Sequence, residues 1–259
     1  MDGMGENELV TNSTIETLLA HRTIRSFTAE PVPENVLATL FEVARQAPTS
    51  NSYQQVTIIR IKDPAIRHEV YQASLQKYVD GPNAELLLFV IDLNRNRQIR
   101  ESVGVDNEVM SKATIFLQGI EDVMIAAQSV VVAAESLGLG TCYLGSIGGD
   151  TRRVIKALNL PKHTFPLVGL LVGYPNQDPA LKPRLPLSIT TSVDTYPEFD
   201  PDSEDFAEYN QTIQTYYDLR TPDRPMESFT NQVCKKPGSG RPEQSPLLDI
   251  LREQGLALN

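Results

Sequence analysis

Residues 120–137 constrain the fold of this chain more than any other stretch, because they form an apolar helix with almost no polar side. A surface helix keeps one polar face, so a helix that is apolar all round must be covered by other elements. Gly138 and Gly140 follow and predict where it ends. The apolar run 123–139 is interrupted by polar side chains and falls short of a transmembrane segment. We therefore expect this helix at the centre of a folded domain.

Short strands and amphipathic helices flank this helix along the chain. Residues 86–91 are continuously apolar, as in a strand of a sheet that is covered on both faces. Further strands are predicted at 56–61, 141–144 and 165–172. Strands separated by helices indicate a layered α+β fold. A capping box at Ser13 and Glu16 predicts the start of a first helix. Further helices are predicted over 33–47, 63–75, 97–118 with one break, 150–158, 206–217 and 245–255.

The net charge narrows the possible partners. The chain of 259 residues has a formal charge of −10 and a pI near 4.9. Nucleic acid and anionic membranes require a broad basic surface, so neither is expected to bind. The two cysteines and three histidines show no metal-ligand spacing and provide no disulfide framework. The first residues lack the pattern of a signal peptide, so we expect a cytoplasmic protein without a metal site.

The composition changes after residue 175. Residues 182–186 form a stiff basic turn, and residues 194–208 contain seven acidic side chains and no basic one, which is typical of a solvated linker. A Gly-Ser-Gly sequence at 238–240 predicts a flexible turn before the last helix. We therefore divide the chain into a core, residues 1–175, and a C-terminal extension, residues 176–259, within a single domain.

A compact basic run at residues 21–27 stands out in this acidic chain. Arg22 and Arg25 offer forked donors, and His21, Thr23 and Ser26 lie close to them. This combination suits a phosphate or a carboxylate. A solvated charge cluster at a helix end explains the same residues equally well, because cations also complement the helix dipole there. The run alone leaves both interpretations open.

Several familiar site motifs are incomplete in this sequence. Gly138 and Gly140 could begin a dinucleotide-binding G-x-G-x-x-G, but Tyr143 occupies the third glycine position and the glycines follow a helix. No phosphate-binding G-x-x-x-x-G-K-[ST] occurs. We expect His163 in a surface loop. Other candidate nucleophiles and bases lie in no catalytic motif: Ser136, Ser146, Cys142 and His68.

What recurs instead is a cation close to small or polar loops. The segments are residues 21–27, 49–52 and 143–149, together with Lys182 and Arg184. They are far apart in the sequence but could converge on one phosphate-bearing ligand. The pattern favours an anionic cofactor over side chains that perform the chemistry themselves.

Four motifs follow one another in a recognisable order: HRTIRSF at 21–27, AAESLGLG at 133–140, CYLG at 142–145 and KPRLP at 182–186. In this order they resemble the flavin-dependent nitroreductases, in the branch that prefers NADPH. The resemblance implies a three-layer α-β-α fold with a mixed or antiparallel sheet around a buried central helix. It also implies an interlocked homodimer, FMN as cofactor and NADPH as co-substrate.

The same resemblance assigns the site residues. Arg220 and Arg224 match the pair that binds the NADPH 2′-phosphate. No catalytic side chain is implied, since the flavin carries the chemistry. The residues that match the FMN contacts are His21, Arg22, Thr23, Arg25, Thr49, Ser50, Asn51, Gln76, Tyr143, Gly145, Ser146, Lys182 and Arg184.

Two departures from the family pattern affect this assignment. Ser146 replaces a usual glycine, so a backbone N–H contact requires a negative φ there. The usual serine-rich loop is Pro-Thr-Ser-Asn at 48–51, which keeps its polar atoms and changes their reach. The second departure could alter substrate choice.

The implied reaction is a ping-pong reduction of nitroaromatics, quinones or related acceptors by NADPH through FMN. One alternative is an FMN reductase that supplies reduced flavin to a partner. Another, of a different class, is a non-catalytic flavin-binding or sensing protein. Retention of both Arg220 and Arg224 argues against the latter, because a mere flavin binder needs no NADPH clamp.

Overall fold

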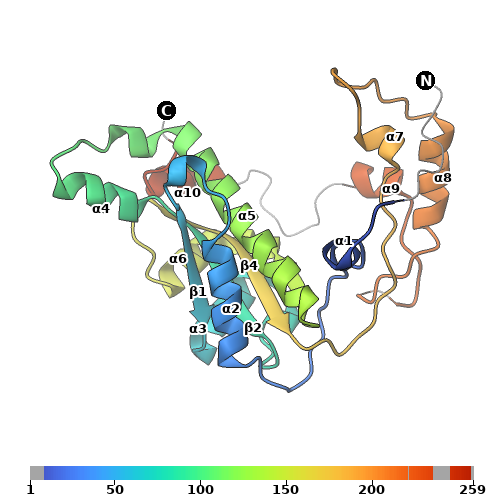
Figure 1. Cartoon of the computed structure of the whole chain (residues 1–259), viewed down its shortest axis with the longest axis horizontal. Coiled ribbons are helices and arrows are strands. Elements are labelled where there is room, and N and C mark those ends of the chain that lie inside the picture. Colours follow the sequence, from blue (N-terminus) through green and yellow to red (C-terminus); the bar gives the residue numbers. More distant parts are fainter. Residues whose placement is uncertain (1–8, 221, 236–245, 258–259) are drawn as a thin grey trace. The chain divides into compact units, whose positions relative to one another are not determined.

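The computed structural model describes residues 9–220, 222–235 and 246–257 (Figure 1). The chain forms two compact units, one of residues 1–177 with 242–259 and one of residues 178–241. The first boundary lies close to the predicted one at residue 175. The last helix differs from that division, because the described residues 246–257 belong to the first unit rather than to the extension.

A four-stranded antiparallel sheet forms the middle of the first unit, in the order β1-β2-β4-β3. Its strands are β1 (Val56–Ile61), β2 (Glu85–Asp92), β3 (Gly140–Leu144) and β4 (Thr164–Gly173). All four were predicted within a few residues. Residues 86–91 of β2 are at most 1% exposed, which confirms that both faces of the sheet are covered.

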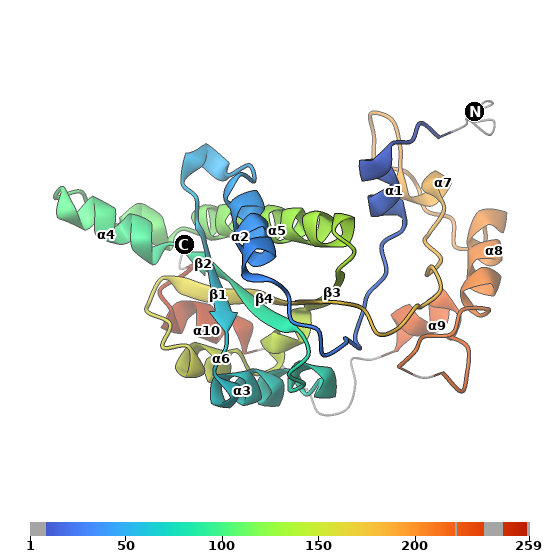
Figure 2. The ribbon, with the colours of Figure 1, turned by 60° about the horizontal axis from the view of Figure 1, so that its bottom comes forward.

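Helices cover both faces of this sheet, giving three layers (Figure 2). On one face lie α2 (Glu34–Arg45) and α5 (Ala113–Ser136), with Leu37 and Val123 in the shared core. On the other face lie α3 (Pro64–Ser74) and α6 (Thr151–Ala157), with Val70 and Val154 in a second core. The remaining helices of this unit are α1 (Ser13–Leu19), α4 (Asn94–Ser102) and α10 (Leu247–Glu253).

The central helix α5 is buried along one side only in this single chain. Eight of its residues are buried against the sheet and α2, whereas Leu117, Met124 and Ile125 are 39–54% exposed. By length and composition it is long and apolar enough to cross a membrane. The mean hydropathy of its most apolar 18-residue stretch is 1.5, and 39% of that stretch is buried. A core helix has the same properties, so its packing in the fold is the more informative observation.

Helix ends follow the predicted rules with one exception. Asp63 and Asp150 cap α3 and α6, as predicted. At α5, Gly138 adopts a φ of 78° and the Leu139 N–H bonds to the Ala134 carbonyl at 3.0 Å, so the helix ends in a Schellman motif. The predicted capping box of α1 is wrong, because the Asn12 side chain accepts the Ile15 N–H and Ser13 is already helical.

The second unit contains α7 (Leu187–Thr190), α8 (Glu204–Ile213) and α9 (Phe229–Cys234). The acidic stretch 194–208 is therefore more than a linker, because its end forms the first turn of α8 and Phe206 is buried. Phe199 and Phe206 pack edge to face at 5.1 Å. The predicted helix 206–217 ends earlier, at Ile213.

The last helix is held to the first unit by polar and apolar contacts. Ile250 and Leu251 enter the α5 core, and Arg152 forms an ion pair with Glu253 at 2.6 Å. The His163 N–H donates to the Gln254 carbonyl at 2.7 Å, and its ring packs on Gly255. His163 was predicted in a surface loop, but its side chain is half-buried beneath the C-terminal helix. The predicted turn at 238–240 and cap at Ser245 lie outside the described residues.

Candidate functional site

The basic run is an extended segment beside β3, beyond the end of α1. The Ile24 N–H donates to the Thr141 carbonyl at 2.8 Å, and Phe27 forms a bridge with Pro175. Ile24 and Phe27 are buried, so the intervening polar side chains are fixed from both sides. A Cβ on Gly140 would lie 2.6 Å from an Ile24 side-chain carbon, so the glycine opens strand β3 and allows this close approach rather than only ending α5.

His21 is held by Glu135 in the last turn of α5. Its Nδ1 lies 2.8 Å from Glu135 Oε1, and the Thr141 hydroxyl donates to the same oxygen at 2.7 Å. The exposed fraction is 33% for the His21 side chain and 13% for that of Glu135. Glu135 was not predicted as a site residue, although an acidic residue in the last turn of an apolar helix could have indicated one.

Arg22 carries a buried donor that the described residues do not satisfy. Its Nη1 bonds to the Ala20 carbonyl at 3.1 Å, but Nε is buried without a hydrogen-bond partner among the described residues. A buried guanidinium N–H without an acceptor is destabilising. Arg25 lies close to Tyr78, where burial raises the pKa of the phenol and Arg25 partly offsets that rise. The run therefore has the donors for an anion.

Tyr143, Gly145 and Ser146 lie where β3 passes into a 3₁₀ turn over Gly145–Asp150. The Tyr143 hydroxyl donates to Gln128 at 3.2 Å. Burial, with the nearby charge of Glu135, raises the pKa of Tyr143 to about 12, so this phenol stays protonated at neutral pH. Gly145 faces open space, and Ser146 is not among the residues with positive φ, which satisfies the backbone condition stated above.

Gln76 lies next to this turn. Leu75 ends α3 in a left-handed conformation with a φ of 55°, and the Gln76 N–H bonds to the Ser74 hydroxyl at 3.3 Å. A Cβ on Gly149 would lie 2.7 Å from the Ala73 carbonyl oxygen, so the end of α3 and the 3₁₀ turn are in close contact. The structure thus brings the end of α3, which Gln76 follows, against the 3₁₀ turn that follows β3.

The loop that carries Thr49, Ser50 and Asn51 is held elsewhere on α5, by Asp122. Asp122 is fully buried and accepts the Ser50 N–H at 2.7 Å and the Gln55 N–H at 3.1 Å. Asp122 precedes Glu135 by thirteen residues of α5, so the two anchors are about 20 Å apart along the helix axis. Within one chain the loop therefore does not reach the basic run.

A cavity of about 750 Å³ adjoins that loop. Its walls come from α2, the loop, β1, α4 and α5, and include Phe41, Val56 and Ile58. Its Arg60 is already paired with Glu85 at 2.7 Å and Glu34 at 2.8 Å. An apolar cavity with a few polar groups has the character of a small-molecule site.

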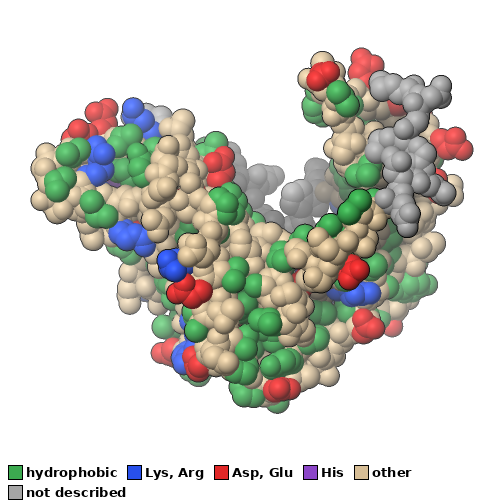
Figure 3. Space-filling model, in the orientation of Figure 1, with side chains coloured by type: hydrophobic (Ala, Val, Ile, Leu, Met, Phe, Trp, Pro, Cys, Tyr) green, Lys and Arg blue, Asp and Glu red, His purple; other side chains and the backbone are tan. Residues whose placement is uncertain are grey.

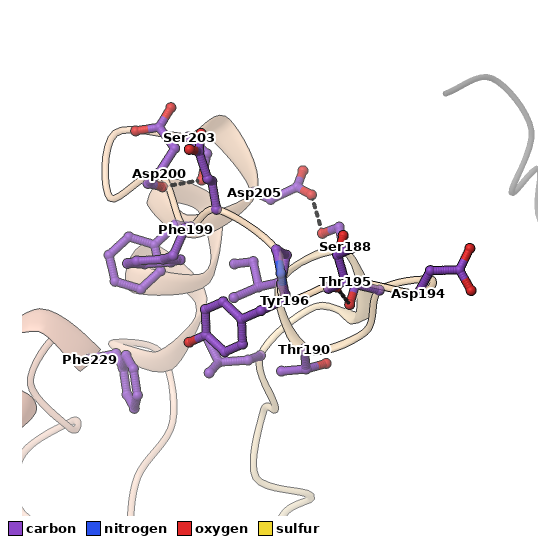
Figure 4. A pocket seen from close by; sticks show the side chains of 16 residues that line it. Ser188, Thr190, Asp194, Thr195, Tyr196, Phe199, Asp200, Ser203, Asp205 and Phe229 are labelled. Atoms are coloured by element: carbon purple, nitrogen blue, oxygen red, sulfur yellow. Dashed lines mark hydrogen bonds between the residues drawn. The ribbon is translucent and has the colours of Figure 1, made fainter.

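The second unit contains a larger cavity of about 970 Å³ (Figure 4). Phe199 and Tyr196 lie on its wall, and Ser188 bonds to Asp205 there. The residues that line it include four carboxylates and no Lys or Arg: Asp194, Glu198, Asp200 and Asp205. Such a lining repels phosphate, so this cavity is unsuited to an anionic cofactor despite its size.

The remaining predicted site residues belong to the second unit. Arg184 is exposed and Lys182 half-buried in the loop before α7. Arg220 is bidentate on buried Asp218, at 3.0 and 2.8 Å, and Arg224 is exposed. Their assignment to FMN and NADPH remains a prediction.

Comparisons with known proteins agree with this geometry. The nitroreductase family profile matches residues 18–174, and the profile of its C-terminal domain matches residues 182–259. An NADPH-flavin oxidoreductase of Vibrio harveyi is 37% identical over 95% of this chain and 99% of its own length. An FMN reductase (NADPH) of Bacillus subtilis is 35% identical over 96% and 100%. The crystal structure of nitroreductase A from Vibrio parahaemolyticus superposes with a TM-score of 0.85 at 34% identity, covering 96% and 100%.

The three-layer fold, shared with nitroreductase A at a TM-score of 0.85, and the two family profiles define the class of protein as a flavin oxidoreductase of the nitroreductase type. The chain belongs to the nitroreductase family. The resemblance drawn from its four motifs is confirmed, and so is the predicted fold class.

Proposed function

We propose that this protein is an FMN-dependent oxidoreductase that uses NADPH to reduce nitroaromatics, quinones or related small acceptors. The observation that carries the proposal is the basic run, whose Arg22 Nε is buried without an acceptor among the described residues. The names of two relatives, NADPH-flavin oxidoreductase and FMN reductase (NADPH), support the choice of flavin and donor.

The residues of the first unit fit FMN in two groups. His21, Arg22, Thr23 and Arg25 would hold the phosphate, because guanidinium forks pair with phosphate oxygens. Gln76, Tyr143, Gly145 and Ser146 would lie toward the ring, where a glycine that faces open space leaves room for it. Lys182 and Arg184 belong to the second unit, and their contact with FMN stays a prediction of the family resemblance.

FMN held by these residues would supply the redox chemistry, namely transfer of two electrons from NADPH to the acceptor. The protein orients the partners and excludes water. Tyr143 acts at most as a hydrogen-bond donor, since its pKa of about 12 keeps the proton on the phenol. Arg220 would exchange Asp218 for the NADPH 2′-phosphate, which its planar fork also matches. One pocket shared by donor and acceptor leads to ping-pong kinetics.

A homodimer would complete the site. Two α5 helices could pack antiparallel about a two-fold axis near residue 128. The loop that Asp122 holds in one protomer would then lie beside the basic run that Glu135 holds in the other. The exposed side chains Met124 and Ile125 lie close to that axis, and Ile99 on α4 and Val103 at its end are exposed as well. Figure 3 shows hydrophobic side chains among charged ones over the region of α4. The loop with Thr49–Asn51 would then serve the partner's FMN. The two cysteines, Cys142 and Cys234, form no disulfide among the described residues, which supports a cytoplasmic setting.

Oligomeric state tests this arrangement directly. Met124→Glu with Ile125→Glu should convert a dimer to a monomer by light scattering and should lose FMN. Leu248→Glu, which is equally apolar and 62% exposed on α10, is the matched control and should remain a dimer with FMN. A monomeric wild-type protein with full FMN would refute the shared site.

The decisive test of the activity is an absorption spectrum before and after NADPH under anaerobic conditions. Yellow protein should bleach with NADPH and regain its colour with nitrofuran, quinone or free FMN. Comparing these acceptors separates a nitro or quinone reductase from an FMN reductase that serves a partner. Yellow protein that NADPH does not bleach would be the non-catalytic flavin binder.

Variants then test the assigned residues. Arg22→Ala should give largely colourless protein, whereas Arg252→Ala, which removes an exposed pair with Asp249, should keep its flavin. Arg220→Ala should raise the KM for NADPH and leave bound FMN intact. Full flavin occupancy in Arg22→Ala would contradict the phosphate assignment.

A further inference from the structure

Glu135 occupies an unfavourable place for a carboxylate. It lies in the last turn of α5, where the helix dipole repels negative charge, and its side chain is only 13% exposed. Two donors compensate for this, His21 Nδ1 at 2.8 Å and the Thr141 hydroxyl at 2.7 Å, both on the single oxygen Oε1. The arrangement joins the C-terminal end of α5, the basic run and β3.

The contact fixes which nitrogen of His21 carries a proton. An ionised carboxylate can only accept hydrogen bonds, so the Nδ1–H of His21 donates to it. Nε2 is then the one ring nitrogen left for a ligand. Thr141 also accepts the Ile24 N–H through its carbonyl, so the backbone that carries His21 cannot move independently of Glu135.

We propose that Glu135 is a positioning residue that couples FMN binding to the charge state of His21. This inference rests on the proposed function, in which His21 faces the FMN phosphate. With a carboxylate at Nδ1 and a phosphate at Nε2, the imidazole has an acceptor at each nitrogen. Only the doubly protonated imidazolium can donate to both. Glu135 thus holds the ring in the orientation and charge state that bind phosphate.

A proton balance follows from this geometry. With Glu135 accepting from Nδ1 and the phosphate accepting from Nε2, the bound ring carries two protons, so FMN binding takes up one proton wherever the flavin-free ring carries a single proton. Glu135 from α5 contacts His21 directly, and Arg22 follows it in its own segment. Tyr143 from β3 interacts with the charge of Glu135, and its pKa of about 12 keeps it neutral in this range, so the proton belongs to the His21–Glu135 pair.

FMN and riboflavin affinities against pH provide the test. For wild-type protein, the dissociation constant for FMN should rise about tenfold per pH unit on the alkaline side, whereas that for riboflavin, which has no phosphate, should stay flat. Glu135→Gln keeps an oxygen acceptor but removes the charge, so it should weaken FMN about tenfold at pH near 8 and leave riboflavin unchanged. Equal weakening of both ligands would overturn the proposal, because it would indicate structural damage alone.

Thr141→Val is the matched control for the loss of one hydrogen bond to the same carboxylate oxygen. It should keep the pH profile of FMN binding, because the His21–Glu135 contact survives. If Thr141→Val abolished the pH dependence of FMN binding and Glu135→Gln did not, the positioning role of Glu135 would be overturned.

Nitrogen NMR of the imidazoles provides a readout without FMN. The chain has three histidines, so His68→Asn and His163→Gln variants assign the His21 signals. In the flavin-free protein, Nδ1 of His21 should carry the proton that is bonded to Glu135, and with FMN bound both ring nitrogens should carry a proton. A His21 protonated on Nε2 alone would refute the positioning role even if FMN binds tightly. Failure of wild-type protein to bind FMN would refute the proposed function as well.

Discussion

Asp122 and Glu135 lie on the same helix and hold two different segments, but by different kinds of donor. Asp122 is fully buried and accepts two backbone N–H groups, from Ser50 and Gln55. Glu135 is partly exposed and accepts two side-chain donors, from His21 and Thr141. Backbone donors are present at almost every residue, whereas an imidazole donor requires one particular residue. Asp122 therefore fixes the shape of a loop, and Glu135 fixes the chemistry of a side chain.

The largest effect is expected from Asp122→Ala. It leaves two buried backbone N–H groups without their charged acceptor, so the free energy of unfolding should fall by about 3 kcal/mol. Urea unfolding measures this loss. The dependence of the free energy of unfolding on urea concentration shows whether unfolding stays two-state. Asp122→Asn keeps the size and one carbonyl acceptor and should lose less. A fall below about 1 kcal/mol in Asp122→Ala would show that the loop holds its shape without this anchor.

Gly140→Ala tests the other segment through packing alone. The new Cβ would lie within 2.6–2.9 Å of Ile24 side-chain carbons, so we expect a loss of about 2 kcal/mol and displacement of the basic run. FMN content should fall with it, as measured by the flavin released from purified protein. Gly148→Ala, whose Cβ would meet nothing within 4 Å, is the control and should be neutral. If Gly140→Ala kept the wild-type free energy of unfolding, the basic run could shift away from the new Cβ without cost.

Glu135→Ala should lower the free energy of unfolding by about 1 kcal/mol, which is less than the loss expected for Asp122→Ala. The side chain is partly solvated and its removal relieves an unfavourable interaction with the helix dipole. Urea midpoints of the two variants, measured side by side, make the comparison. Equal losses would remove the distinction between an anchor for shape and an anchor for chemistry.

His163 provides the smallest effect and a contrast with His21. Burial, followed by the charge of Arg97, lowers the pKa of His163, whereas His21 faces a carboxylate. The unfolded chain therefore binds this proton more readily than the folded one. Stability is full above the unfolded pKa of about 6.5 and declines as the pH falls through the lower folded value. Between pH near 8 and pH near 5, the urea midpoint should fall less for His163→Gln than for the wild-type protein. An equal fall of the midpoint in both proteins would refute this.

Sequence patterns predicted much of the fold because they report local periodicity. The strand at 86–91, the helix ending at Gly138 and the caps Asp63 and Asp150 depend on neighbours within a few residues. The cap of α1 was misassigned by one residue, because Asn12 and Ser13 are both competent caps. The buried side of His163 was missed, because α10 covers it from more than eighty residues away.

The candidate site divides in the same manner. The amino-acid sequence by itself determined the motifs of the nitroreductase family, the apolar helix and the cations of the basic run. Only the tertiary structure decided that Glu135 meets His21, that Asp122 holds the Thr49–Asn51 loop and that Gly140 admits Ile24. Periodicity describes which face of an element is apolar, whereas a hydrogen bond between distant residues depends on how the packed elements are aligned. That alignment is set by the whole core, so no local pattern contains it.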